Sequence, residues 1–167
     1  MNIVGNVGMS LGVTEVLSAG LQAGGLALAQ SFAKGFSAGT LAGQCDLYWS
    51  KSSTLLNSTS ETWTLSALTD ALGRAVVFAR VRAILIIPQS IVEGDDLTIG
   101  GAALHEWTAL MGAAGATFPV KSLGAYFGIA MNTTGYIVGI GTSDQLKVNN
   151  LSTHSITYQI GLIGASV

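Results

Sequence analysis

One short stretch of the sequence has the residue types of a nucleophilic hydrolase. Residues 35–39 read Gly-Phe-Ser-Ala-Gly, and Asp144 and His154 follow Ser37 in the order found in α/β-hydrolases. That motif works only where a strand enters and a helix leaves the turn that exposes the serine, within a parallel sheet. Here it lies in a stretch rich in Gly, Ala and Ser, where such pentapeptides arise by chance. We therefore expect no catalytic residues and no enzymatic activity.

Acidic and histidine residues form two candidates for a metal site. Residues 93–96 read Glu-Gly-Asp-Asp, and His105 precedes Glu106. Oxygen-rich sets of this kind suit Ca²⁺ best. However, an Asp-Asp pair after glycine is ordinary turn chemistry between strands, and the second histidine of a zinc-protease helix is missing. We expect no metal and no cofactor.

The single cysteine, Cys45, excludes an intrachain disulfide and a cysteine-based zinc cluster. We expect it to act as a small buried hydrophobic residue. Sequons at Asn57, Asn132 and Asn150 would matter only in a eukaryotic secretory pathway, to which nothing else in the sequence points.

Five aromatic residues could form a platform on which sugar rings stack. They are Trp49, Trp63, Trp107, Tyr48 and Tyr126. Aromatic residues more often anchor a core or a subunit interface, because they bury a large area and still satisfy one polar group. We favour the core or interface role over carbohydrate binding.

Charge is scarce in this sequence. Only 10% of the 167 residues are charged, against about 25% in an ordinary soluble domain, and 49% are hydrophobic. Either uncharged Ser, Thr, Asn and Gly cover the surface, or much of it is buried in an oligomer, which we favour. The net charge of -2 provides no basic face for nucleic acid. The first residues lack the positive region of a secretory signal, so secretion by that route is not expected.

Residues 1–45 are predicted to form a glycine-rich N-terminal arm whose only charges are Glu15 and Lys34. The pattern is not typical of strands. Residues 14–21 and 26–36 are candidates for short helices, each marginal because a helical glycine costs about 1 kcal/mol relative to alanine. Glycines spaced four residues apart would let two backbones approach closely. We expect a partly helical or irregular arm that packs between subunits and anchors the protein.

A membrane span is the alternative for part of this arm. The charge-free stretch 16–33 is close to the minimum length that crosses a bilayer. Its serines, glutamines and glycines dilute the hydrophobicity, so we do not expect a membrane partner.

From residue 46 onward the sequence changes to short runs of β-branched and aromatic residues separated by turn residues. The clearest strand is 76–87, whose odd positions form an apolar face that includes Val81, with Arg80 and Arg82 on the other face. Further strands are expected at 96–100, 125–131, 136–141, 145–149 and 156–163. No helix-length periodic segment separates them. The sequence therefore predicts a mainly β chain, with an antiparallel β-sandwich or jelly roll over residues 46–167.

Several segments of this β region also carry a family resemblance. They are residues 61–85, 97–103, 133–138, 141–150 and 156–164, for example Thr-Ser-Asp-Gln-Leu-Lys-Val-Asn-Asn within the fourth. Through them, residues 46–167 resemble small β-sandwich virion proteins of tailed bacteriophages, whereas the arm has no counterpart. The resemblance implies a capsid decoration (cement) protein, or a head-fibre or spike component. Such a protein would be a homotrimer made in the host cytoplasm and seated on the major capsid protein at the virion surface. No functional residues are carried over with it.

Three other functions compete with a structural virion protein. The first is a receptor- or glycan-binding module of a spike or fibre that uses the tryptophans. The second is a small membrane-associated protein that uses residues 16–33. The last is an esterase that uses Ser37.

Overall fold

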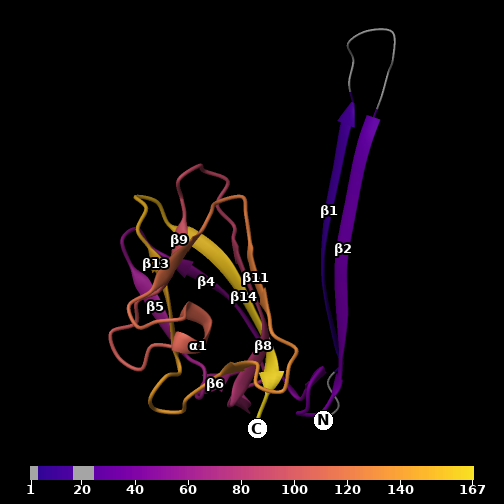
Figure 1. The fold of residues 1–167 in the computed structure, drawn as a ribbon. Helices are drawn as coiled ribbons and strands as arrows, with labels where there is room; N and C mark the ends of the chain where they lie inside the picture. The colour runs from indigo at the N-terminus through magenta and orange to yellow at the C-terminus, as the bar shows by residue number, and fades with distance from the viewer. Residues whose placement is uncertain (1–3, 17–24) are drawn as a thin grey trace, which may run out of the picture.

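The computed structural model of the chain describes residues 4–16 and 25–167. In this part of the chain, strands dominate and the only helix is α1 (Thr108–Met111), a single turn. The expectation of a mainly β protein is therefore confirmed. The strands build a two-sheet sandwich and a long hairpin that stands beside it (Figure 1). No helix among these described residues is long and apolar enough to cross a membrane.

Two antiparallel sheets make up the sandwich. The first contains β4 (Leu47–Leu55), β8 (Arg80–Pro88), β11 (Tyr126–Ile129), β12 (Tyr136–Ile137) and β14 (Ile156–Ala165). The second contains β5 (Ser60–Thr64), β9 (Leu97–Gly100), β10 (Thr117–Val120) and β13 (Gln145–Asn150). Their strand orders are β11-β8-β14-β4, with β12 also paired to β8, and β10-β9-β13-β5. A small extra pair joins β6 (Leu68–Thr69) to β7 (Ala75–Val76).

The hydrophobic core fills the space between the two sheets. Strand β14 shows the alternation that builds it, since Ile156, Tyr158, Ile160 and Leu162 are all buried while the residues between them are more exposed. Buried side chains of β8 in the same sheet, and of β9 and β13 in the opposite sheet, belong to the same core. Each fully buried aliphatic side chain contributes about 1.5 to 3 kcal/mol, so this core accounts for the stability of the sandwich.

The strands expected at 96–100, 125–131, 145–149 and 156–163 are present as β9, β11, β13 and β14. The run at 136–141 forms only the two-residue strand β12. Strands β4, β5 and β10 were not predicted, because β4 and β5 are rich in serine and threonine and β10 is short and contains a proline.

The strand predicted at 76–87 is present as β8 only from Arg80, since Val76 belongs to β7 and residues 77–79 are not in a strand. Strand β8 also differs from its prediction in which side chains face the core. Val81 is buried as expected, but Ile84 and Ile86 join it in the core, and Leu85 is exposed. The cause is a β-bulge. Ile163 of β14 pairs with Ala83 and Gly164 pairs with Val81, so Arg82 is an extra residue with no partner on β14. One extra residue exchanges the two faces of a strand, so the prediction that odd-numbered side chains face the core is wrong beyond Val81.

The N-terminal arm is a long β-hairpin rather than a set of short helices. Strand β1 (Gly5–Val16) pairs antiparallel with β2 (Gly25–Ala38), and the end of β2 pairs with the short strand β3 (Gln44–Cys45). The helix expected at 26–36 is therefore wrong. Of the helix expected at 14–21, residues 14–16 belong to β1, and the remainder lies outside the described residues. Part of the candidate membrane span at 16–33 also lies outside the described residues.

The register of the hairpin explains why these residues form strands. Cross-strand partners share a face, and the described pairs separate by size. The larger pairs are Val7 with Lys34 and Met9 with Phe32, and the smaller pairs are Gly8 with Ala33 and Ser10 with Ser31. The arm thus has one bulky and one small face, which is a two-residue period that the glycine spacing obscured.

Candidate functional site

A small hydrophobic cluster attaches the base of the hairpin to the sandwich. Its buried members are Phe36 of β2, Cys45 of β3 and Ala83 of β8. Half-buried Val7, Ile129, Met131 and Ile163 pack around them. This anchor cluster is separate from the core between the sheets. It lies on the outer face of the β8 sheet, where the bulge has placed Ala83.

Cys45 is fully buried, as the sequence predicted. Burial raises the pKa of its thiol above the ordinary value, and the adjacent Asp46 carboxylate raises it further, although Arg82 opposes this in part. A cysteine becomes a nucleophile through a lowered pKa and exposure. Cys45 therefore packs the base of the arm and is not a reactive thiol.

Arg82, the extra residue of the β8 bulge, fixes the same region by hydrogen bonds. Its guanidinium is fully buried, and it donates from Nη1 to the Asn132 carbonyl at 2.5 Å and from Nη2 to the Thr40 carbonyl at 2.6 Å. Thr40 lies between β2 and β3, and Asn132 follows β11. Burial lowers the pKa of Arg82, with a smaller effect from Arg80, but an arginine stays charged at neutral pH. The buried cation thus ties the root of the arm to the sandwich.

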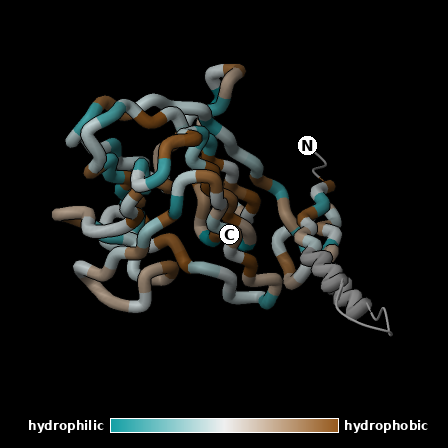
Figure 2. The backbone as a smooth tube through the Cα atoms, turned by 90° about the horizontal axis from the view of Figure 1, so that it is seen from above, coloured by the Kyte–Doolittle hydropathy of each residue, from teal (hydrophilic) through white to brown (hydrophobic). Residues whose placement is uncertain are grey.

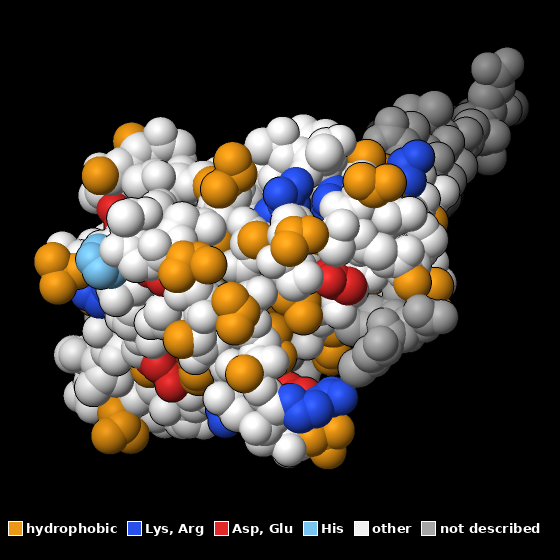
Figure 3. All heavy atoms as spheres, turned by 90° about the horizontal axis from the view of Figure 1, so that it is seen from below, with side chains coloured by type: hydrophobic (Ala, Val, Ile, Leu, Met, Phe, Trp, Pro, Cys, Tyr) orange, Lys and Arg blue, Asp and Glu red, His pale blue; other side chains and the backbone are white. Residues whose placement is uncertain are grey.

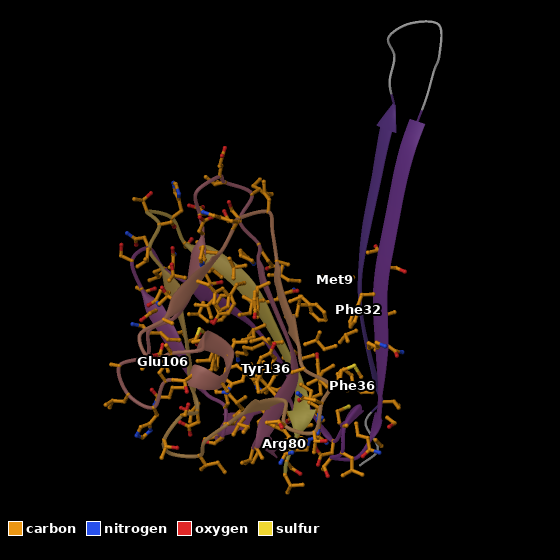
Figure 4. All side chains as sticks on the ribbon, viewed as in Figure 1. Met9, Phe32, Phe36, Arg80, Glu106 and Tyr136 are labelled. Carbon is orange, nitrogen blue, oxygen red and sulfur yellow. The ribbon has the colours of Figure 1, made fainter. Side chains whose placement is uncertain are left out.

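Next to this anchor, the hairpin and the outer face of the sheet enclose an open groove of about 430 Å³. One wall is β1 at residues 6–9, and the other comes from β4, β8, β14 and the start of β11. No residue that lines the groove carries a charge. Met9 on the hairpin is 56% exposed, and its cross-strand partner Phe32 lies beside it (Figure 4). On the facing wall, Tyr48 is 52% and Leu85 is 38% exposed.

The arm departs from the sandwich toward its tip. In Figure 1 the two are close at the base and separate further up, and the described part of the arm extends above the sandwich. Seen from above, the arm also stands to one side of the body (Figure 2). The underside of the molecule carries scattered hydrophobic groups and only a few charged side chains (Figure 3).

The hydrolase-like residues are distributed over three different places. Ser37 is exposed on β2, and its amide donates to the Gly43 carbonyl. Asp144 accepts a hydrogen bond from the Ser66 hydroxyl at 2.5 Å. The Nδ1 atom of His154 lies 3.0 Å from an Asp95 carboxylate oxygen, so its partner is not Asp144 or Ser37. Ser37 also lies within strand β2, where it pairs with Gln44 of β3, and not at the strand-to-helix turn that a nucleophile elbow requires.

The candidate metal ligands already have hydrogen-bond donors from the protein. Glu106 is buried and accepts from the amides of Gly101 (2.6 Å) and Gly115. Asp96 accepts from Lys121 and from the Ser122 amide, each of which lowers its carboxyl pKa. Within the described part of the chain, no group of three or more His, Cys, Asp or Glu residues is placed to hold a metal ion.

The aromatic residues are core elements for the most part. Trp49 and Trp107 are buried, and their indole N–H groups donate to the carbonyls of Thr69 and Ile137. Trp63 packs edge-on against Trp49 and donates to the buried hydroxyl of Tyr158. Trp49 and Trp107 therefore offer no exposed ring face to a sugar. Of the five aromatic candidates, only Tyr48 is exposed, and it lines the groove.

At one end of the sandwich, polar residues fix the loops that follow β4, β8 and β13. Asn150 is buried and donates to the carbonyls of Leu56 (3.0 Å) and His154 (2.7 Å). The asparagine of this sequon therefore holds the loop after β13 against the loop after β4. Asp95 accepts from His154 and Ser90, and these hydrogen bonds lower its carboxyl pKa. The sequons at Asn57 and Asn132 are exposed.

Comparison with protein-family models, curated proteins and solved structures finds no match to this chain. The hairpin, its anchor and the groove were not predicted as a site. The signal that could have located the hairpin is the alternation of large and small residues along β1 and β2. No local signal marks Arg82, since its role depends on a bulge and on two distant carbonyls.

Proposed function

We propose that this protein is a structural virion protein that binds the capsid surface and stabilises or decorates it, as a cement or decoration protein. The observation that carries this proposal is a hairpin arm with few charges that is attached to the sandwich at its base, through Phe36 and Arg82, and extends away from it. A two-stranded hairpin is marginally stable alone in water, so such an arm needs a protein partner. The low charge of the whole chain also favours burial of part of its surface against a protein partner.

In this function the sandwich is the rigid body and the arm is the attachment element. Apolar side chains and unpaired strand edges of the hairpin would supply the binding energy through burial and backbone pairing. The proposed partners are further copies in a homotrimer and the major capsid protein. The resemblance of residues 46–167 to virion proteins of tailed bacteriophages supports this class. Neither nucleic acid nor a cofactor has a role, and no residue acts as a catalyst.

The glycan-binding alternative loses its main support in this fold. Sugar recognition by stacking requires exposed aromatic faces, whereas Trp49 and Trp107 are buried and Trp63 packs against Trp49. The esterase alternative requires Ser37, Asp144 and His154 together, and each of them has other partners.

The test is the association of the chain with virus particles. Particles are purified on a density gradient from the culture in which the chain is made, and their proteins are identified by mass spectrometry. We expect the chain to travel with intact particles, and particles without it to break at lower temperature. Particles that never contain the chain would refute the proposal.

A further inference from the structure

We infer that the hairpins of three copies of this chain pair edge to edge and close into a six-stranded antiparallel barrel. In this barrel β1 of each copy pairs with β2 of the next, and the small face of the hairpin lines the interior. The inference rests on the proposed function for the homotrimer, and it assigns the surface through which the three copies associate.

The hairpin has two long strand edges that lack a partner strand in the described part of the chain. Strand β1 pairs with β2 over all 12 of its residues, and no other described strand pairs with β1. On the outer side of β2 only Ser37 and Ala38 are paired, with β3. A long unpaired edge is a template for pairing with another chain.

The edges of the sandwich are protected against such pairing. Edge strands β10 and β11 have four residues each and β5 has five, and β10 also contains Pro119, which cannot donate a backbone hydrogen bond. The longer edge strand, β4, carries exposed Lys51 at its centre, and a lysine on an edge discourages pairing. Strands β1 and β2 contain no proline. The hairpin edges are therefore the ones that are open to a partner strand.

The small face of the hairpin has the composition of a narrow interior. Its described cross-strand pairs are Asn6 with Gly35, Gly8 with Ala33 and Ser10 with Ser31, and all six residues are exposed. The two charged residues of the hairpin, Glu15 and Lys34, are at register positions of the bulky face. Met9, Phe32 and Phe36 of that bulky face lie toward the sandwich, so the small face is directed away from it (Figure 4). The small face can therefore be buried without removing a charge from water.

The size of these residues sets the number of copies. A barrel of eight strands is just wide enough for ordinary side chains to fill its interior, and a barrel with fewer strands is narrower. Six strands therefore suit an interior of glycine, alanine and serine, and two strands per copy give three copies.

Threefold rotation also satisfies the directions of the strands. Around an axis parallel to the hairpins, every β1 runs one way and every β2 runs the other, so β1 meets β2 of the next copy in the antiparallel sense. Such a head-to-tail contact closes into a ring, and a closed ring pairs both free edges of every hairpin. The bulky faces then point outward, where each hairpin is attached to its own sandwich.

The first experiment builds a metal site on the threefold axis. Interior residues of a symmetric barrel form rings of three, so Ser10→His in the full-length chain would place three imidazoles around the axis. Three histidines are a good ligand set for Zn²⁺. By isothermal titration calorimetry we expect one Zn²⁺ per three chains in addition to any binding by the natural chain. Lys34→His, at an exposed position on the bulky face, is the matched control and should add no site. No added site in Ser10→His, or the same added site in both variants, would overturn the inference.

The second experiment overfills the interior and measures the trimer by light scattering. Ala33 is exposed in a single chain and would be enclosed in the barrel, so Ala33→Trp should leave the chain folded but raise the dissociation constant of the trimer at least roughly tenfold. Lys34→Trp places the same side chain on the bulky face and should associate like the natural chain. Circular dichroism establishes that both variants are folded. A trimer of unchanged stability in Ala33→Trp would contradict an interior position for this face.

Hydrogen exchange tests the edge pairing itself. In a separate hairpin about half of the β1 amides point away from β2 and have no acceptor, whereas in the barrel all of them are paired. Peptides that cover residues 5–16 should therefore be protected almost completely in the natural trimer. In dissociated Ala33→Trp they should keep about half of that protection. Half protection in an intact natural trimer would show that the copies associate through another surface.

These outcomes separate the inference from the proposed function. A chain that occurs in virus particles but is a monomer, or a trimer whose β1 amides are half protected, contradicts the inference and leaves the virion role in place. A chain that forms the barrel but never occurs in particles contradicts the virion role and leaves the inference in place.

Discussion

The anchor of the arm can be broken without unfolding the sandwich, and Phe36→Ala is the change that does it. Phe36 is buried in the anchor cluster, which shares no buried residue with the core between the sheets. Replacing a buried phenylalanine by alanine costs about 3 to 5 kcal/mol, and the lower figure fits a cluster of this small size. Since each 1.4 kcal/mol is a factor of ten, the opening equilibrium of the arm should rise about 100-fold.

Hydrogen exchange followed by mass spectrometry measures this opening peptide by peptide. In Phe36→Ala, amides of residues 31–38 should exchange about 100-fold faster, and the Cys45 thiol should react faster with a thiol reagent because opening exposes it. Amides of β13 and β14 should keep their protection. Leu41→Ala, at an exposed position between β2 and β3, is the control and should change exchange neither in residues 31–38 nor in β13 and β14. An equal loss of protection in β14 would refute the separation of the anchor from the core.

Three further predictions concern the sandwich itself. Ile160→Asp should destabilise the protein by more than the roughly 2 to 5 kcal/mol of an Ile→Ala change, because a buried carboxylate adds a desolvation cost, and thermal melting measures this. Asn150→Ala should cost roughly 1 to 3 kcal/mol in urea unfolding, since it removes the buried amide that donates to the carbonyls of Leu56 and His154 and leaves them only their bonds from Thr59 and Ser152. A loss near zero would contradict a structural role for this amide. The carboxyl pKa of Asp95 is lowered from 3.8 on folding, so its contribution is present above that pH and is lost as the pH falls through the lower folded value. Unfolding at pH 2 to 5 should therefore show a weaker pH dependence in Asp95→Asn than in the natural chain.

The sandwich was largely predictable because its strands follow local rules. In β14, the alternation of Ile156, Tyr158, Ile160 and Leu162 with more polar neighbours gives both the strand and its buried face. The face of β8 was not predictable, because the bulge at Arg82 results from pairing with β14 and not from the sequence of β8.

The arm shows how one pattern can obscure another. Glycines at four-residue intervals favour the interpretation of a helix face, whereas a strict alternation of large and small residues runs through Val7, Gly8, Met9 and Ser10. The hairpin follows that alternation because pairing of β1 with β2 places the larger side chains of both strands on one face and the smaller ones on the other, whereas each glycine would destabilise a helix. The groove could not be predicted, since its two walls are far apart in sequence and are joined by the anchor cluster and by the hydrogen bonds of Arg82.

Measuring the mass of the full-length chain in solution by light scattering tests the central claim most directly, namely that the protein works by associating through its apolar surfaces. We predict an oligomer of about three times the 17.1 kDa of one chain that persists on dilution. A stable, monodisperse monomer over the whole concentration range would contradict the account.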